Sequence, residues 1–276
     1  MTTTGSALAR MHGVIIDMDG VLFRGSLPIP GASEFLGFLE RMDIPFLLLT
    51  NNSTRTAKQY VTKLSDMGMR VDEEKILTTS MATAMYLSQV APPGTEVYMV
   101  GEEGLRVELE KKGFALLDGP DVPYVVVGYD RTFTYEKMET ATLAVRAGAK
   151  FIATNPDRTY PGERGIVPGA GAILASIEAA TDVAPTIVGK PQRAIFELAL
   201  RLMQAEAKGA AMVGDRLETD ILGAQQLGLL TILLLSGVTS AQQLESSLIV
   251  PDLVCCDIAA LHLAWRSAID VKLNEA

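Results

Sequence analysis

The chain has the sequence pattern of an α/β protein with a mainly parallel sheet. Short apolar runs typical of β-strands alternate with segments whose apolar residues recur at helical spacing. The 276 residues, 48% of them apolar, suffice for one large domain or two smaller domains with a buried core. No internal repeat or low-complexity tract interrupts the alternation. We therefore expect a globular protein in which strands and helices follow one another.

Eight apolar runs are expected to be strands, and helices are expected to fill most of the gaps between them. Helical spacing is clearest in residues 34–39 and 194–200, whose aromatic side chains we place in the core. The expected strands are Val14–Ile16, Phe46–Leu49, Val97–Val100, Tyr124–Val127, Phe151–Ala153, Thr186–Val188, Ala211–Val213 and Thr231–Leu235.

Two short stretches are predicted to connect two domains. Thr78–Ser80 and residues 181–185 lie on either side of a segment that has its own strands and helices. A domain inserted into a loop of another domain is tolerated where both ends of the insert lie close together at the surface. The prediction is a core formed by residues 1–80 and 185–276, with residues 81–184 as the inserted domain.

Charge and composition exclude several partner classes. The net charge of −9 is spread without a long single-sign block, which argues against a nucleic-acid polymer and against a membrane surface as partner. A small phosphorylated ligand is still compatible with this negative net charge, because a metal ion and local cations can make the binding site positive. Residues 1–11 have no apolar core of signal-peptide length, and a cytoplasmic location is expected. Cys255 and Cys256 lack zinc-site spacing and are expected to be buried thiols.

Two carboxylates lie two residues apart where the first expected strand ends. Side chains of Asp17 and Asp19 point the same way on an extended backbone, so both can converge on one site beyond the carboxyl end of the strand. Like charges this close persist where a metal ion neutralises them or where one acid carries a proton. The alternative is a solvated turn, because Asp and Gly are ordinary turn residues.

Three more polar clusters follow or adjoin expected strands. Thr50–Thr54 offers hydroxyls and amides for phosphate oxygens, Lys190 lies between a glycine and a proline, and Asp215 follows Gly214 and precedes Asp220 by five residues. Taken singly, the favoured interpretations are a helix N-cap for the first, a surface lysine for the second and a common turn for the third. Together with the acid pair, their order is hard to attribute to four unrelated turns.

This arrangement resembles the haloacid dehalogenase-like superfamily of phosphohydrolases, in the branch of the p-nitrophenyl-phosphatases and nucleotide phosphatases. The resemblance covers essentially the whole chain and rests on Asp17–Leu22, Thr50–Asn52, Gly189–Pro191 and Gly214–Asp220. It implies a Rossmann-like, three-layer core with a parallel sheet and a large α/β cap of the C2 type. The family inserts that cap between the threonine and the lysine motifs, a position that residues 81–184 fit.

The resemblance also implies residue roles. Asp17 would be the nucleophile that forms an aspartyl-phosphate, and Asp19 would be the general acid and base. Mg²⁺ would be bound by Asp17, Asp215 and the backbone carbonyl of Asp19, while Asp220 would orient metal-bound waters or Lys190.

The remaining implied roles concern the substrate. Thr50, Asn51 and Asn52 would supply donors to the phosphate oxygens, and Lys190 would offset negative charge during phosphoryl transfer. In the cap, the polar loop with Asn155, Asp157 and Arg158 would contact the leaving group. An ordinary Asn-Pro turn is the alternative for that loop. An apolar cap face would permit a homodimer formed through the cap.

The expected function is that of a Mg²⁺-dependent phosphomonoesterase acting on nucleotides, sugar or glycerol phosphates, or pyridoxal phosphate. A phospho-accepting signalling module could also combine an acid cluster, a hydroxyl residue and a lysine on an α/β sheet. A non-catalytic binding protein that retains the fold is the third reading.

Overall fold

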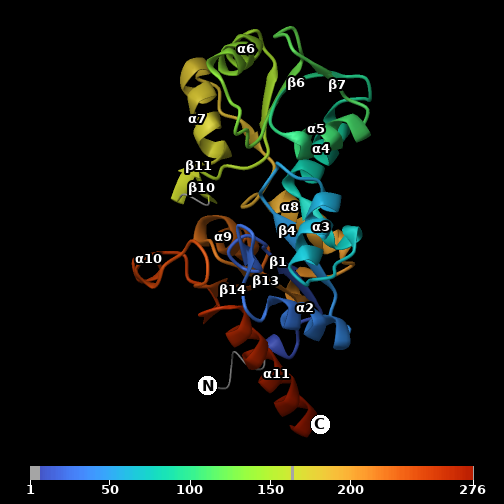
Figure 1. Ribbon diagram of the computed structural model, residues 1–276, viewed down its shortest axis with the longest axis vertical. Helices are drawn as coiled ribbons and strands as arrows, with labels where there is room; N and C mark the ends of the chain where they lie inside the picture. Colours follow the sequence, from blue (N-terminus) through green and yellow to red (C-terminus); the bar gives the residue numbers. More distant parts are fainter. Residues whose placement is uncertain (1–6, 163–164, 276) are drawn as a thin grey trace. The chain divides into compact units, whose positions relative to one another are not determined.

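The computed structural model describes residues 7–162 and 165–275, which divide into two compact units (Figure 1). The first unit is formed by the described residues of Met1–Leu49, Val61–Ile76 and Phe196–Ala276, and the second by those of Thr50–Tyr60 and Leu77–Ile195.

The predicted insert, residues 81–184, lies within the second unit. That unit also includes residues 50–60, 77–80 and 185–195, which the sequence pattern places in the predicted core. Residues 1–6, 163–164 and 276 of the predicted domains lie outside the described residues. The division into a catalytic core and a specificity cap stays a prediction.

A six-stranded sheet lies mainly in the first unit, with the strand order β15-β14-β13-β1-β4-β5. The pairings of β1 with β4 and β13, of β13 with β14 and of β14 with β15 are parallel. Consecutive residues of β1 are fully buried, as expected for a parallel strand that is covered on both faces. The strands are β1 (Gly13–Ile16), β4 (Phe46–Thr50), β5 (Ile76–Thr78), β13 (Ala210–Gly214), β14 (Leu230–Leu234) and β15 (Leu253–Cys255).

Aromatic side chains join two helices of the first unit, α2 (Ala32–Arg41) and α11 (Ile258–Glu275). The ring centroid of Phe35 lies 5.9 Å from that of Trp265, and the ring of Phe38 lies 4.9 Å from that of His262. The remaining elements outside the second sheet are β2 (Phe23–Arg24), β3 (Leu27–Pro28), α3 (Ala57–Asp66), η1 (Glu73–Lys75), α8 (Arg193–Leu202), η2 (Ala207–Gly209), η3 (Leu217–Ile221), α9 (Leu222–Gln225) and α10 (Ala241–Glu245).

The second unit contains a five-stranded sheet of order β12-β9-β8-β6-β7, in which every pairing is parallel. A two-stranded antiparallel hairpin, β10–β11, precedes α7. The elements are α4 (Thr79–Val90), β6 (Glu96–Val100), α5 (Glu103–Lys111), β7 (Ala115–Leu117), β8 (Tyr124–Val127), α6 (Tyr135–Arg146), β9 (Lys150–Ala153), β10 (Thr159–Gly162), β11 (Gly165–Pro168), α7 (Ala170–Thr181) and β12 (Thr186–Ile187).

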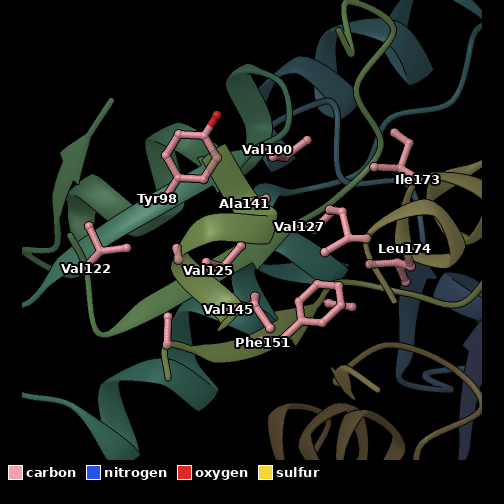
Figure 2. Packing of buried hydrophobic residues seen from close by; sticks show 14 residues of the cluster. Tyr98, Val100, Val122, Val125, Val127, Ala141, Val145, Phe151, Ile173 and Leu174 are labelled. Carbon is pink, nitrogen blue, oxygen red and sulfur yellow. The ribbon is translucent and has the colours of Figure 1, made fainter. Parts of the chain in front are cut away.

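Helices cover both faces of this second sheet. Figure 2 shows Val125 and Val127 of β8 packed with residues of α6 and α7, among them Val145 and Leu174. Their neighbour Tyr124 points to the opposite face, where its hydroxyl donates to the carbonyl of Val90 in α4 at 3.1 Å. The second unit therefore contains a helix–sheet–helix sandwich with its own apolar core.

The predicted α/β fold class is confirmed. Each of the eight expected strands is present, and α2 and α8 contain the two segments with the clearest helical spacing. Short elements such as β5, β7 and the two hairpins were not predicted, because two to four residues carry too little periodicity. No described helix combines the length and the apolar content needed to cross a bilayer.

The prediction for the cysteines was wrong. Cys255 is half-buried and Cys256 is exposed. The reason is that β15 lies at the edge of the six-stranded sheet, where a neighbouring strand covers only one side.

Candidate active site

Two of the predicted site residues follow paired strands in the first unit. Asp17 comes directly after β1 and Asp215 directly after β13, and Ile16 pairs with Val213 in the sheet. The backbone N–H of Asp17 donates to the carbonyl of Val213 at 2.9 Å. Because parallel strands end at the same edge of a sheet, the two carboxylates are brought together there.

A third carboxylate joins them. Asp17, Asp215 and Asp220 are buried, and each offers an oxygen within 4.8 Å of the others. The single π-helical turn η3 brings Asp220 back toward the end of β13. One oxygen of Asp220, Oδ2, accepts from the backbone N–H groups of Asp215 at 3.2 Å and Arg216 at 3.1 Å. These bonds fix the orientation of the Asp220 carboxylate.

Glycines make this convergence sterically feasible. A Cβ atom at Gly214 would overlap the side chain of Asp220, and a Cβ atom at Gly237 would overlap the carboxylate of Asp215. Gly20 also borders Asp215 and has a φ of 88°, in the left-handed region that favours glycine. Any larger residue at these positions would push the acids apart.

The loop after β14 belongs to the site, although the sequence analysis did not include it. The backbone N–H of Val238 donates to Oδ2 of Asp215 at 2.6 Å, and the hydroxyl of Ser236 donates to the carbonyl of Gly20 at 2.8 Å. The available signal was the Ser236-Gly237 pair at the end of a predicted strand, the same context that singled out the other clusters.

The donor set of the acid cluster fits a hard divalent cation. Three buried like charges repel one another strongly unless a cation or a proton compensates them. Carboxylate oxygens without sulfur or imidazole ligands are the set that Mg²⁺ prefers. Asp19 is half-buried, and its carboxylate is not part of the cluster. The ligand role expected for its backbone carbonyl stays a prediction.

The predicted phosphate-binding residues lie in the second unit. Thr50, at the end of β4, is buried, and its hydroxyl oxygen accepts from the backbone N–H of Asn52 at 3.0 Å. Oδ1 of Asn52 in turn accepts from the backbone N–H of Thr54 at 2.9 Å and from its hydroxyl at 2.8 Å. The segment therefore forms a tight turn that side-chain oxygens hold in shape.

Asn51 is bonded to the backbone of Lys190. Its Oδ1 accepts from the Lys190 N–H at 2.9 Å, and its Nδ2 donates to the Lys190 carbonyl at 3.0 Å. Gly189 permits this approach, since a Cβ atom there would lie 2.7 Å from Oδ1 of Asn51. Lys190 itself is 2% exposed, an unusual degree of burial for a lysine.

Two of the three predicted leaving-group contacts lie beside Asn51. The buried Asn155 donates from Nδ2 to the carbonyl of Asn51 at 2.7 Å, and Oδ2 of Asp157 accepts from Nδ2 of Asn51 at 3.2 Å. Arg158 is exposed, and its carbonyl accepts from the N–H of Gly169 at 2.9 Å. Contact of these residues with a substrate stays a prediction.

Ser53 links the Thr50–Thr54 turn to the end of β8. Its buried hydroxyl oxygen accepts from the N–H of Tyr129 at 3.0 Å, and its carbonyl accepts from the hydroxyl of Ser80 at 2.9 Å. Burial raises the pKa of Tyr129 above its ordinary value, and the nearby Arg131 opposes part of that rise. Tyr129 therefore stays a neutral phenol at physiological pH.

Comparison with known proteins identifies the family. Residues 14–115 match a model of the haloacid dehalogenase-like hydrolases, and residues 187–261 match a second, HAD-hydrolase-like model. The acid sugar phosphatase of Staphylococcus haemolyticus is 42% identical over 233 residues, which cover 84% of this chain and 88% of that protein.

Solved structures agree. The 4-nitrophenylphosphatase of Thermotoga maritima superposes with a TM-score of 0.88 at 33% identity, over 93% of this chain and 98% of that one. A glycerol phosphate phosphatase of Mycobacterium tuberculosis in complex with magnesium has a TM-score of 0.85 at 32% identity, over 94% of this chain and 79% of that one. The chain therefore belongs to the haloacid dehalogenase-like hydrolases, in the p-nitrophenyl-phosphatase branch, and it is a phosphatase.

Proposed function

We propose that this phosphatase is a Mg²⁺-dependent phosphomonoesterase that acts on small phosphorylated metabolites, with sugar and glycerol phosphates foremost. The observation that carries the proposal is the cluster of three buried carboxylates, Asp17, Asp215 and Asp220, with oxygens within 4.8 Å of one another. The substrate class is supported by relatives that are named acid sugar phosphatase and glycerol phosphate phosphatase.

In the first step, a carboxylate oxygen of Asp17 attacks the phosphorus atom in line with the ester oxygen. The bond between phosphorus and the leaving oxygen breaks, and Asp19 donates its proton to that oxygen. The product alcohol departs and Asp17 carries the phosphoryl group as an acyl phosphate.

In the second step, water attacks the phosphorus atom of the aspartyl-phosphate. Asp19, now ionised, accepts the proton of the water, and the bond between phosphorus and Asp17 breaks. Inorganic phosphate leaves and both acids return to their initial protonation states.

The other residues stabilise charge during both steps. Asp17 and Asp215 would hold Mg²⁺, and the fixed carboxylate of Asp220 would orient its waters. When bound, Mg²⁺ supplies positive charge that offsets the repulsion between the nucleophile and the phosphate. The Thr50 hydroxyl, the backbone N–H of Asn51, the side-chain amide of Asn52 and the Lys190 ammonium would contact or neutralise the phosphoryl oxygens.

The test is phosphate release from a panel of phosphomonoesters with and without Mg²⁺. The panel contains p-nitrophenyl phosphate, glycerol phosphates, sugar phosphates, nucleotides and pyridoxal phosphate. We expect metal-dependent turnover that is greatest on sugar or glycerol phosphates and is lost in Asp17→Asn, whereas the exposed control Asp66→Asn stays active. Substantial turnover in Asp17→Asn would refute the nucleophile assignment. A stable phosphorylated protein without turnover would indicate a phospho-accepting module instead.

A further inference from the structure

The side-chain amide of Asn51 has no hydrogen left for a phosphate ligand. A primary amide carries two N–H hydrogens. In Asn51 one is donated to the carbonyl of Lys190 at 3.0 Å and the other to Oδ2 of Asp157 at 3.2 Å. The amide oxygen accepts from the N–H of Lys190 at 2.9 Å. The whole functional end of the side chain is thus directed at two protein segments.

The two bonds to Lys190 constrain its backbone in a specific way. Asn51 accepts from the N–H and donates to the C=O of the same residue, as a neighbouring strand would. A pair of bonds to one residue fixes both its position and its rotation, and these bonds are buried. The direction in which the Lys190 side chain leaves the backbone is therefore set by Asn51.

Asn155 and Asp157 hold Asn51 from the other side. Asn155 donates to the Asn51 carbonyl at 2.7 Å, and Asp157 accepts from its side chain. Oδ1 of Asn155 also accepts from the backbone N–H of Asp157 at 3.1 Å, so the loop after β9 is braced internally. The contacts form a chain from this loop through Asn51 to Lys190.

We infer that Asn51 is a positioning residue for Lys190, and that Asn155 and Asp157 support Asn51 instead of reading the leaving group. This inference rests on the proposed function, in which Lys190 offsets charge on the phosphoryl group. A displaced ammonium weakens a step common to every phosphomonoester. Loss of the support must therefore lower the rate by a similar factor on all substrates, whereas loss of a leaving-group contact changes their ranking.

The first experiment is a double-mutant cycle between Asn51→Ala and Lys190→Ala. Asn51→Ala keeps its backbone N–H, so the measured loss belongs to the side chain. Misplacement of a catalytic group by about 1 Å costs on the order of 100-fold, and we expect kcat to fall roughly 10- to 100-fold in Asn51→Ala with a smaller change in KM. In the Lys190→Ala background, Asn51→Ala should cause little further loss. Additive losses would overturn the inference.

The second experiment compares leaving groups in Asp157 variants. Asp157→Ala should lower kcat by the same factor on p-nitrophenyl phosphate, a glycerol phosphate and a sugar phosphate. Asp157→Asn keeps an acceptor oxygen for Asn51 and should restore most of the rate. A changed substrate ranking in Asp157→Ala would overturn the inference and assign Asp157 to the leaving group. Asp121→Asn, an exposed carboxylate of the same unit, is the matched control.

Circular dichroism establishes whether each variant is folded. If Asn51→Ala does not fold, Asn51→Asp replaces it, because it keeps the shape and the acceptor for Lys190 but loses both donors. If neither Asn51 variant folds, the Asp157 series decides. A wild type without phosphatase turnover would refute the proposed function, whereas an active wild type with additive or substrate-selective losses would refute only the inference.

Discussion

At the scale of single residues, the smallest side chains determine where the charged ones lie. Gly20, Gly214 and Gly237 surround the acid cluster, and each leaves space that a Cβ atom would take from Asp215 or Asp220. The acids alone therefore do not define the site. The glycines beside them, which have no side chain, are needed for the same geometry.

Gly237→Ala should weaken metal binding without changing any ligand. The new Cβ atom would overlap the Asp215 carboxylate, which must shift. Changes of groups that orient metal ligands cost roughly 10- to 100-fold in metal affinity, and we expect a loss of that order in Mg²⁺ activation. Activity titrated against Mg²⁺ concentration measures it.

Gly209→Ala is the control for that substitution, because its Cβ atom would meet its nearest neighbour, His12, at an ordinary 3.4 Å. An unchanged Mg²⁺ requirement in Gly237→Ala would show that the Asp215 carboxylate does not bind the metal in the orientation seen here.

At the scale of elements, an edge strand and a helix pair carry titratable groups whose pKa values are shifted by their surroundings. Cys256 follows β15 and is exposed, whereas Cys255 ends the strand and is half-buried. Burial raises the pKa of Cys255 to about 11, and the charges of Cys256 and Asp257 contribute to that rise. Between α2 and α11, burial lowers the pKa of His262, Arg266 and Arg41 lower it further, and Glu34 opposes them.

The two adjacent thiols should react at different rates. At neutral pH the Cys255 thiol stays protonated and half-buried, and the thiolate is the reactive species. We expect an alkylating reagent to label one thiol rapidly in the native protein, and that fast label to disappear in Cys256→Ser. Peptide mapping by mass spectrometry assigns the label. Rapid labelling of Cys255 in that variant would contradict the stated environment.

His262 should make the protein less stable in mild acid. Because its folded pKa lies below the ordinary value of 6.5, the unfolded chain binds the proton first as the pH falls. The free energy of unfolding therefore declines as the pH falls below that value and levels off below the folded pKa. Urea unfolding between pH ~7.5 and pH ~5 should show a larger decline for the wild type than for His262→Gln. Equal declines in the wild type and in His262→Gln would mean that His262 has the same pKa in the folded and the unfolded chain.

At the scale of the whole molecule, the predicted site residues fall into two groups, one in each unit. Asp17, Asp19, Asp215 and Asp220 belong to the first, and Thr50, Asn51, Asn52, Lys190 and the loop with Asn155, Asp157 and Arg158 belong to the second. The second unit thus contains the insert predicted from the sequence together with the residues proposed to hold the phosphate.

Mg²⁺ should stabilise the folded protein as a whole. A ligand that binds only the folded state contributes about 2.7 kcal/mol at 100 times its Kd, which for a chain of this size raises Tm by roughly 5 to 10 °C. Scanning calorimetry with and without Mg²⁺ measures the shift. Asp215→Ala should show a much smaller shift, and an equal shift in that variant would place the bound metal elsewhere.

The sequence by itself determined the fold class and eight of the strands, and it also gave the predicted site residues. These follow from local properties: apolar runs of one strand length, and polar residues that come directly after them. Asp17 and Asp215 were predictable as partners because any two parallel strands of one sheet end at the same edge.

Only the tertiary structure decided how those residues are used. The bonds of Asn51 to Lys190 join residues 139 positions apart, and the loop at Val238 reaches Asp215 from 23 positions away. No periodicity encodes such contacts, because they depend on which strand ends become neighbours and on glycines that admit close approach. The pattern therefore gave Asn51 as a phosphate ligand, while its hydrogen bonds point to a positioning role.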